Sequence, residues 1–247
     1  MKKVIMFSYS ITAYLLAFVS IVFWILSIGN LIPEVSIDGP PKVPFGIALL
    51  TNTGLVLLFG LQHSIMARKP FKDFFTRYFP KPIERSTFVL FSSLLLFVLL
   101  YGWQPMGGTI WTVPKFSIAY YSIYVLFFIG WFILFLSTFL ISHFDMFGVR
   151  QTFLELQKKP YEPLGFKIGS LYKYVRHPLY FGMLLAVWAT TNMTVTHLVF
   201  AVGVTIYVIF GATLEERDLV KEFGRQYQEY QKRKPMLIPF TKRRIKN

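Results

Sequence analysis

The chain has 247 residues, of which 54% are hydrophobic, 19% are aromatic and only 15% are charged. Soluble domains are about 45–50% apolar and about 25% charged, so both departures predict a membrane protein. The lack of cysteine excludes disulfides, thiolate metal sites and a cysteine nucleophile, and the formal charge of +14 lies in loops between apolar segments, which favours membrane topology over nucleic-acid binding.

The first apolar segment follows Met1-Lys2-Lys3 and extends from Val4 to about Leu31. A helix over this segment is roughly 40 Å long, which is enough to cross a bilayer. No small-residue cleavage motif separates it from the next apolar segment, so we expect a retained first span and no cleaved signal peptide.

Three further single spans are expected over about Phe45–Met66, Thr87–Tyr101 and Ile118–Ile141. The last apolar region, Leu179–Leu214, is too long for one upright helix, and the polar segment Asn192-Met193-Thr194 interrupts it near the middle. We therefore predict a helical hairpin over this region.

The basic residues set the orientation of these spans. Lys and Arg number two before the first span, six in residues 68–85, six in residues 150–176 and ten after residue 214, whereas the intervening loops carry only Lys42 and Lys115. The positive-inside bias then places both termini in the cytoplasm, and only a hairpin returns the most basic segment to that side.

The sequence thus predicts an all-α, multi-pass transmembrane bundle of four spans plus a C-terminal helical hairpin. A cytoplasmic amphipathic helix follows, because Leu219, Phe223 and Tyr230 form an apolar stripe, and Gly224 marks a bend in it. We expect residues 1–240 to form one domain and residues 241–247 to be a disordered basic tail.

Arg176-His177-Pro178 stands at the start of the hairpin. Pro178 biases His177 away from helical geometry and suits a first helical turn, whose N–H groups form an anion site able to take a carboxylate. Gly182, one turn later, lets a backbone or a ligand approach closely. The alternative is that Arg176 and His177 only anchor the helix at the membrane interface.

Glu215 and Glu216 follow the hairpin, where the chain leaves the bilayer. Ionisable groups at the margin of a membrane segment are costly and indicate function by default. Carboxylates beside a cationic cluster suit a zwitterionic cofactor with its own positive centre. They are equally consistent with the solvated first turn of a helix, because acidic residues are favourable near a helix N-terminus.

Two more segments carry candidate polar groups. His143 and Asp145, just past the fourth span, are suited to orient a substrate, to relay a proton or to cap a helix. Gln62-His63, deep in the second span, indicates packing between helices more than substrate contact. The four histidines are scattered without a metal-binding motif, and no nucleophile, Walker A or dinucleotide motif is present.

The pattern Tyr-x-Tyr-x-x-Arg-His-Pro-x-Tyr-x-Gly from Tyr172 to Gly182, with Glu215-Glu216 and the later Phe223-Gly224, resembles the membrane methyltransferases that include isoprenylcysteine carboxyl methyltransferase. Most of the chain looks like the bacterial methanethiol S-methyltransferases, relatives of the NnrU and nurim proteins. That similarity extends to the segments His143 to Gln151 and Gln62 to Arg68.

The resemblance implies S-adenosylmethionine as donor, methanethiol as acceptor, dimethyl sulfide as product and a bacterial cytoplasmic membrane. It does not determine the oligomeric state. Prenylcysteine methyltransferases often carry an arginine about one turn before the acidic pair, where this chain has Phe210-Gly211-Ala212-Thr213. A small neutral acceptor is therefore favoured. A methyltransferase of a lipid or prenylated acceptor and a non-enzymatic protein of the nurim or NnrU type stay as alternatives.

The resemblance also suggests roles for the site residues. The expected general base is Glu216 or His177, with Glu215 as second choice, because methanethiol must lose a proton. Arg176 and the N-terminus of the hairpin are expected to hold the cofactor carboxylate. The remaining predicted positions are Tyr174, Tyr180 and Gly182 against the cofactor, and His143, Asp145 and Arg150 on the acceptor side.

Overall fold

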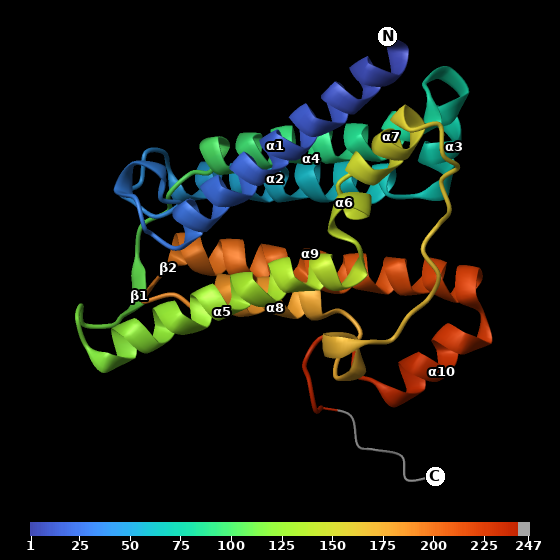
Figure 1. Ribbon diagram of the computed structural model, residues 1–247. Helices are drawn as coiled ribbons and strands as arrows, with labels where there is room; N and C mark the ends of the chain where they lie inside the picture. Colours follow the sequence, from blue (N-terminus) through green and yellow to red (C-terminus); the bar gives the residue numbers. More distant parts are fainter. Residues whose placement is uncertain (242–247) are drawn as a thin grey trace. The chain divides into compact units, whose positions relative to one another are not determined.

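The computed structural model describes residues 1–241 and is mainly helical, with one small sheet of β1 (Thr109–Thr112) and β2 (Asn192–Thr194). Within these residues, five helices are long and apolar enough to cross a membrane (Figure 1). They are α1 (Lys2–Ile28), α2 (Phe45–Met66), α4 (Glu84–Gly102) with the preceding 3-10 turn η2 (Lys81–Ile83), α5 (Ile118–Ile141) and α9 (Val195–Phe223). The prediction of an all-α, multi-pass membrane protein is confirmed.

The predicted hairpin consists of α8 (Pro178–Trp188) and α9, with β2 at the polar break between them. Its arms are unequal. α8 has 11 residues and is about 16 Å long, which is too short to cross a bilayer as a helix, whereas α9 has 29 residues.

The described residues form two compact units. Unit 1 comprises residues 1–110, 142–163 and 193–200, and unit 2 comprises residues 111–141, 164–192 and those from 201 onward. The single domain expected over residues 1–240 stays a prediction, and residues 242–247 of the expected basic tail lie outside the described residues.

In unit 1, α1 packs against α4 and against α7 (Val149–Leu156), and α2 packs on the other side of α4 (Figure 1). The short helices α3 (Lys69–Tyr78) and α6 (His143–Met146) and the 3-10 turn η1 (Pro33–Val35) complete this unit. His63 in α2 lies 3.2 Å from the Ser92 hydroxyl in α4, through Nδ1. This contact is the interhelical packing expected for the Gln62-His63 pair.

A buried polar cluster in unit 1 joins the loop after α1 to the hairpin bend. The Asp38 carboxylate accepts hydrogen bonds from Thr194 Oγ1 and, at 2.8 Å, from Asn30 Nδ2. His197 Nδ1 lies 3.7 Å from its Oδ2. Burial by itself raises the pKa of Asp38, but the contacts with His197, Thr194 and Asn30 outweigh it and hold that pKa below its usual range.

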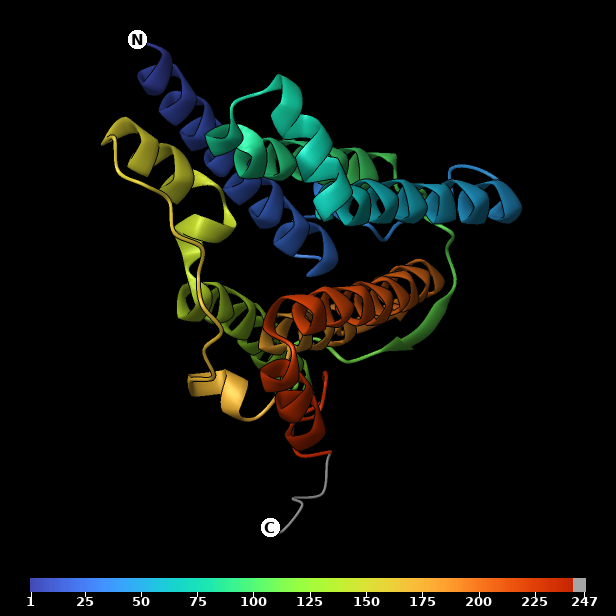
Figure 2. The same cartoon turned by 90° about the vertical axis from the view of Figure 1, so that its right-hand side faces the viewer.

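In unit 2, α5 and α8 run side by side (Figure 2). Two glycines allow this close contact. A Cβ added at Gly182 of α8 would lie 2.5 Å from the Gly130 carbonyl oxygen of α5, and a Cβ added at Gly130 would lie 2.7 Å from the Gly182 oxygen. Gly182 therefore permits the approach of a neighbouring backbone, one of the two uses expected for it.

Candidate active site

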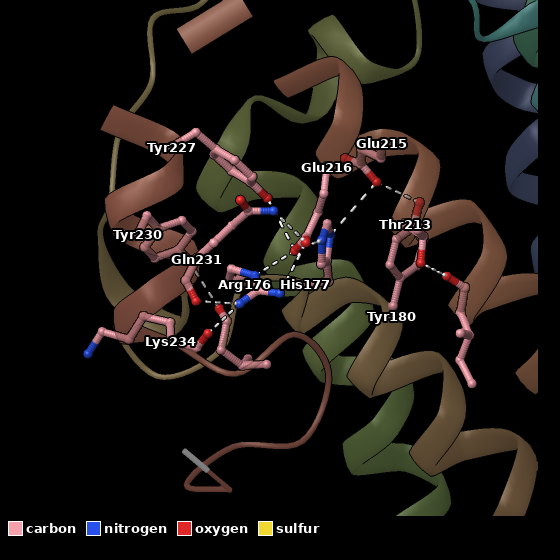
Figure 3. A network of polar contacts seen from close by, with 12 residues as sticks. Arg176, His177, Tyr180, Thr213, Glu215, Glu216, Tyr227, Tyr230, Gln231 and Lys234 are labelled. Carbon is pink, nitrogen blue, oxygen red and sulfur yellow. Dashed lines mark hydrogen bonds and ion pairs between the residues drawn. The ribbon is translucent and has the colours of Figure 1, made fainter. Parts of the chain in front are cut away.

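The start of α8, the end of α9 and the helix α10 (Arg225–Arg233) meet in unit 2 and hold the predicted polar residues (Figure 3). Pro178 is the first residue of α8 and His177 is its N-cap, as the sequence predicts. Gly224, with φ of +56°, turns the chain between α9 and α10, which is the expected bend. The 3-10 turn η3 (Ser170–Lys173) leads into this region.

Glu216 is the centre of the network. Its carboxylate accepts from Arg176 at 2.5 Å (Nε to Oε1) and 3.0 Å (Nη2 to Oε2), and lies 3.0 Å from His177 Nε2. Gln231 Nε2 donates to Oε2 at 2.8 Å, and the Tyr227 hydroxyl lies 3.4 Å from Oε1. Figure 3 shows these side chains converging on the carboxylate of Glu216. Glu216 is a buried residue, with 7% of its surface exposed.

Arg176 also contacts the end of α10 and the segment that follows it. Its Nη1 donates to the carbonyl oxygens of Gln231, at 2.9 Å, and of Lys234. The backbone N–H groups of Arg176 and His177 donate to the carbonyl oxygens of Pro235, at 3.0 Å, and Met236, at 3.1 Å. The segment after α10 is thus attached to the chain just before α8.

Glu215 is more accessible than its neighbour. Its side chain is 45% exposed and accepts a hydrogen bond from the Tyr180 hydroxyl at 2.9 Å. Its Oε2 also lies 3.8 Å from His177 Nδ1, and the rings of His177 and Tyr180 are stacked with centroids 5.3 Å apart. His177 therefore has one carboxylate at each ring nitrogen, one buried and one accessible.

Aromatic residues close the buried side of the network. Phe166 packs against Phe223, Tyr227 and Tyr230, with ring centroids 5.4–5.6 Å apart. Burial, followed by the nearness of the Glu216 carboxylate, raises the pKa of Tyr227, and burial likewise raises the pKa of Tyr230. Both hydroxyls therefore stay protonated and act as donors, that of Tyr230 to the Tyr172 carbonyl oxygen at 2.6 Å.

A polar depression of about 430 Å³ lies beside the network and is lined by Arg176, Gln228, Gln231 and Lys232. Ligand sites commonly have volumes of about 300–1,000 Å³, so the depression is large enough for a small molecule. It presents cationic and amide groups, which suit a carboxylate.

The structure brings five predicted residues into this network, namely Arg176, His177, Tyr180, Glu215 and Glu216. It does not bring in Tyr174, which is 55% exposed and lies with its ring 5.9 Å from that of Phe240. Gly182 lies against Gly130 of α5, and this packing accounts for a glycine there without a ligand.

The predicted acceptor-side residues belong to unit 1, and their role stays a prediction. His143 is buried and its Nε2 lies 3.0 Å from the Tyr14 hydroxyl, which ties α6 to α1. Arg150 Nη1 donates to Asp145 at 2.9 Å, and its guanidinium lies over the Tyr161 ring at 5.2 Å. These contacts hold the segment after α7 in place.

Gln231 was not predicted, although it contacts both Glu216 and Arg176. Its position in the sequence could have indicated it. Gln231 is four residues after Tyr227 and one after Tyr230, so the three side chains share a face of α10. Because α10 is basic and polar, its composition does not indicate that one of its glutamines contacts a buried carboxylate.

Comparison with known proteins identifies the family. The chain is 47% identical over 234 residues to the methanethiol S-methyltransferase of Crocosphaera subtropica, covering 94% of this chain and 91% of the relative. It is 43% identical over 240 residues to methanethiol S-methyltransferase 1 of Bradyrhizobium diazoefficiens, covering 97% and 84%. A more distant similarity, 28% over 181 residues, links it to nurim of Bos taurus, covering 70% of this chain and 68% of the relative.

No protein-family model and no solved structure matches the chain. The two bacterial relatives nevertheless align over most of both sequences. This chain belongs to the methanethiol S-methyltransferase family of membrane methyltransferases.

Proposed function

We propose that the protein transfers a methyl group from S-adenosylmethionine to the sulfur of methanethiol and releases dimethyl sulfide, S-adenosylhomocysteine and a proton. The names of its relatives support the acceptor. The observation that carries the proposal is the arrangement at His177, whose Nε2 lies 3.0 Å from buried Glu216 and whose Nδ1 faces accessible Glu215 at 3.8 Å. A neutral thiol needs such a proton acceptor before it attacks a methyl group.

The residues fit a donor that carries both positive and negative charge. Glu215 offers an accessible carboxylate to a cationic centre, and Lys232 in the adjoining depression offers a cation to a carboxylate. When bound, S-adenosylmethionine supplies a methyl group already activated by a sulfonium, so the protein contributes mainly positioning and exclusion of water.

We assign the base to His177 and a positioning role to Glu216. The Glu216 carboxylate accepts from Arg176, His177 and Gln231 at once, and a carboxylate so engaged holds a proton weakly. A hydrogen bond from Nε2–H to Glu216 leaves the lone pair on Nδ1, which then accepts the thiol proton. Glu215, 3.8 Å from Nδ1 and 45% exposed, offers that proton a path to solvent.

Arg176 is assigned to positioning as well. Four donor contacts from its guanidinium already reach Glu216, Gln231 and Lys234. The sequence predicts that Arg176 and the N-terminus of the hairpin hold the cofactor carboxylate. Because Arg176 is already engaged, Lys232, which lines the adjoining depression, is the cation that we propose for that carboxylate.

The membrane setting suits both reactants. An apolar thiol partitions into lipid and reaches the site from the bilayer, whereas the charged donor arrives from water. The resemblance to the bacterial methanethiol S-methyltransferases supports a bacterial cytoplasmic membrane. The distribution of basic loops supports an orientation with both termini and the site on the cytoplasmic side.

The test is production of dimethyl sulfide in the headspace above membranes from cells that express the chain, supplied with methanethiol and S-adenosylmethionine. Membranes from cells with an empty vector are the control. We expect product only when both substrates are present. If labelled donor binds but no dimethyl sulfide forms, methanethiol is the wrong acceptor, and lipid or prenylated thiols should then be tried in the same membranes.

A further inference from the structure

The connection between the second and third spans contains a helix of its own. α2 ends at Met66, Arg68 is extended with ψ of 148°, and α3 then runs at an angle to α2 (Figure 2). The next span begins with η2 at Lys81. Because α3 joins the ends of two adjacent spans, it must lie where they leave the hydrocarbon layer.

α3 has two chemically distinct faces. Its apolar residues recur at steps of three and four and fall on one side, whereas the charged and polar residues fall on the other. The apolar set is Pro70, Phe71, Phe74, Phe75 and Tyr78, and the polar set is Lys69, Lys72, Asp73, Thr76 and Arg77.

Only part of the apolar face packs within the protein. Phe71 contacts the core formed by α1, α2 and α4, whereas Phe74 is 56% exposed and Tyr78 is 71% exposed. The rings of Phe74 and Tyr78 lie 5.4 Å apart, and Phe79, 53% exposed, extends this aromatic edge beyond the helix. The fold leaves this edge uncovered. Three large aromatic side chains next to one another form an exposed apolar patch, which differs from the single apolar residues scattered over most protein surfaces.

The same segment is strongly basic. Residues 68–83 contain Arg68, Lys69, Lys72, Arg77 and Lys81 but a single acid, Asp73. Asp73 lies 2.6 Å from Lys69 Nζ, so it compensates only one of these cations. An aromatic edge beside an excess of positive charge is the pattern of a helix that lies in the plane of a membrane surface.

We propose that α3 docks on an anionic phospholipid surface. Phe74, Tyr78 and Phe79 enter the boundary between headgroups and acyl chains, and Lys72 and Arg77 contact lipid phosphates. Phospholipid is a better occupant than a second copy of the chain, because two such basic helices would repel each other and because the neighbouring spans already hold α3 at bilayer level.

The lack of cysteine in the chain makes the depth of α3 measurable with single introduced thiols. A bimane label is attached to Phe74→Cys, Tyr78→Cys, Asp73→Cys or Thr76→Cys in the full-length protein. Each labelled protein is reconstituted in phosphatidylcholine vesicles with or without phosphatidylglycerol. Brominated acyl chains then quench labels in the lipid, and iodide quenches labels in water.

We expect bromolipid to quench labels at positions 74 and 78, and iodide to quench labels at positions 73 and 76. Brominated phosphatidylglycerol should quench the label at position 78 more strongly than brominated phosphatidylcholine at the same mole fraction. Each basic residue near an anionic surface contributes a factor of about five to lipid affinity, so Lys72→Gln with Arg77→Gln should reduce that preference by about 25-fold.

The matched control is Lys158→Gln with Lys159→Gln, which removes the same charge from an exposed loop. This control should keep the preference for phosphatidylglycerol. Equal iodide quenching at all four labelled positions would overturn the proposal, as would an equal loss of preference in both double variants. Excimer emission from pyrene attached to Phe74→Cys in place of bimane would show that a second copy covers the aromatic edge, which also overturns the proposal.

Discussion

Arg176 and Glu216 form a two-point ion pair, with Nε 2.5 Å from Oε1 and Nη2 3.0 Å from Oε2. Both side chains are only 9% exposed. Removal of one partner from a buried pair leaves an uncompensated charge, which costs about 3–5 kcal/mol. The pair therefore joins the chain just before α8 to α9, and the position of His177, the proposed base, depends on it.

We expect Glu216→Gln to lower the free energy of unfolding by about 3–5 kcal/mol, because an amide cannot balance the buried charge of Arg176. Turnover should fall as well, since the amide no longer orients His177 as a carboxylate does. Thermal unfolding in detergent and dimethyl sulfide production check the two effects.

The control for that substitution is Glu222→Gln, an exposed acid of the same helix. It should leave the unfolding temperature and turnover near those of the native chain. An unfolding temperature of Glu216→Gln equal to that of the native protein would show that the ion pair contributes no net stability.

His177→Gln tests whether His177 acts as the general base or only holds neighbouring residues in place. The glutamine amide still donates toward Glu216 but has no atom that can take a proton at the Nδ1 position. We expect the variant to fold and to lose about 10²–10⁴-fold in turnover near neutral pH. Its rate should then rise with pH, because the thiolate forms without the protein's help.

That pH profile distinguishes the two roles, since a histidine that only positions its neighbours would lower the rate by the same factor at every pH. Dimethyl sulfide production measured over a pH series, with saturating donor, gives the profile. A flat ratio between native and variant rates would transfer the base to Glu215, whose own Gln variant should then show the rising limb.

Much of the fold is predictable because lipid imposes long apolar helices. The predicted spans at residues 45–66 and 118–141 coincide with α2 and α5, since Pro44 and the polar residues beyond each end limit the apolar segment. The short length of α8 was not predicted. Residues 179–189 are apolar except for the hydroxyl of Tyr180, and composition alone does not show where helical hydrogen bonding stops.

The main residues of the polar site were predictable, but the contacts among them were not. The positions of Arg176, His177, Glu215 and Glu216 follow from charges beside apolar spans, which are rare and costly. That Glu216 is the shared acceptor depends on α10 folding back, through Gln231 and the carbonyl groups after it. Backbone carbonyls are the same in every residue, so no sequence pattern indicates that contact.

Gly182→Ala tests the contact between α8 and α5. The added Cβ would lie 2.5 Å from the Gly130 oxygen and 2.7 Å from the Leu134 nitrogen, both backbone atoms that cannot turn aside. We expect a loss of about 1–3 kcal/mol in stability and a displaced His177, measured as a lower unfolding temperature and lower turnover.

Gly211→Ala is the matched control, because no atom lies within 4 Å of the added Cβ in α9. It should be neutral, or stabilising by up to about 1 kcal/mol, since alanine is the better helix former. Equal behaviour of the two variants would mean that α8 moves away from α5 at little cost.

Asp38 gives a pH dependence of stability with a definite sign. Its contacts with His197, Thr194 and Asn30 hold its pKa below the ordinary value of 3.8 in the folded chain. A carboxyl group whose pKa is lower in the folded chain than in the unfolded chain stabilises the fold. This stabilisation is fully present at a pH above the pKa in the unfolded chain, and it is lost as the pH falls through the pKa in the folded chain.

The unfolding temperature of the native protein should therefore decline as the pH is lowered past about 4, and Asp38→Asn should lack this component of the decline. At neutral pH the variant should already be less stable, because the amide forms weaker contacts with the cluster around it. Tryptophan fluorescence during heating measures both effects, and Asp73→Asn, which removes an exposed acid of α3, is the control. Parallel curves for the native protein and Asp38→Asn would mean that the ionised Asp38 does not hold the loop to the hairpin bend.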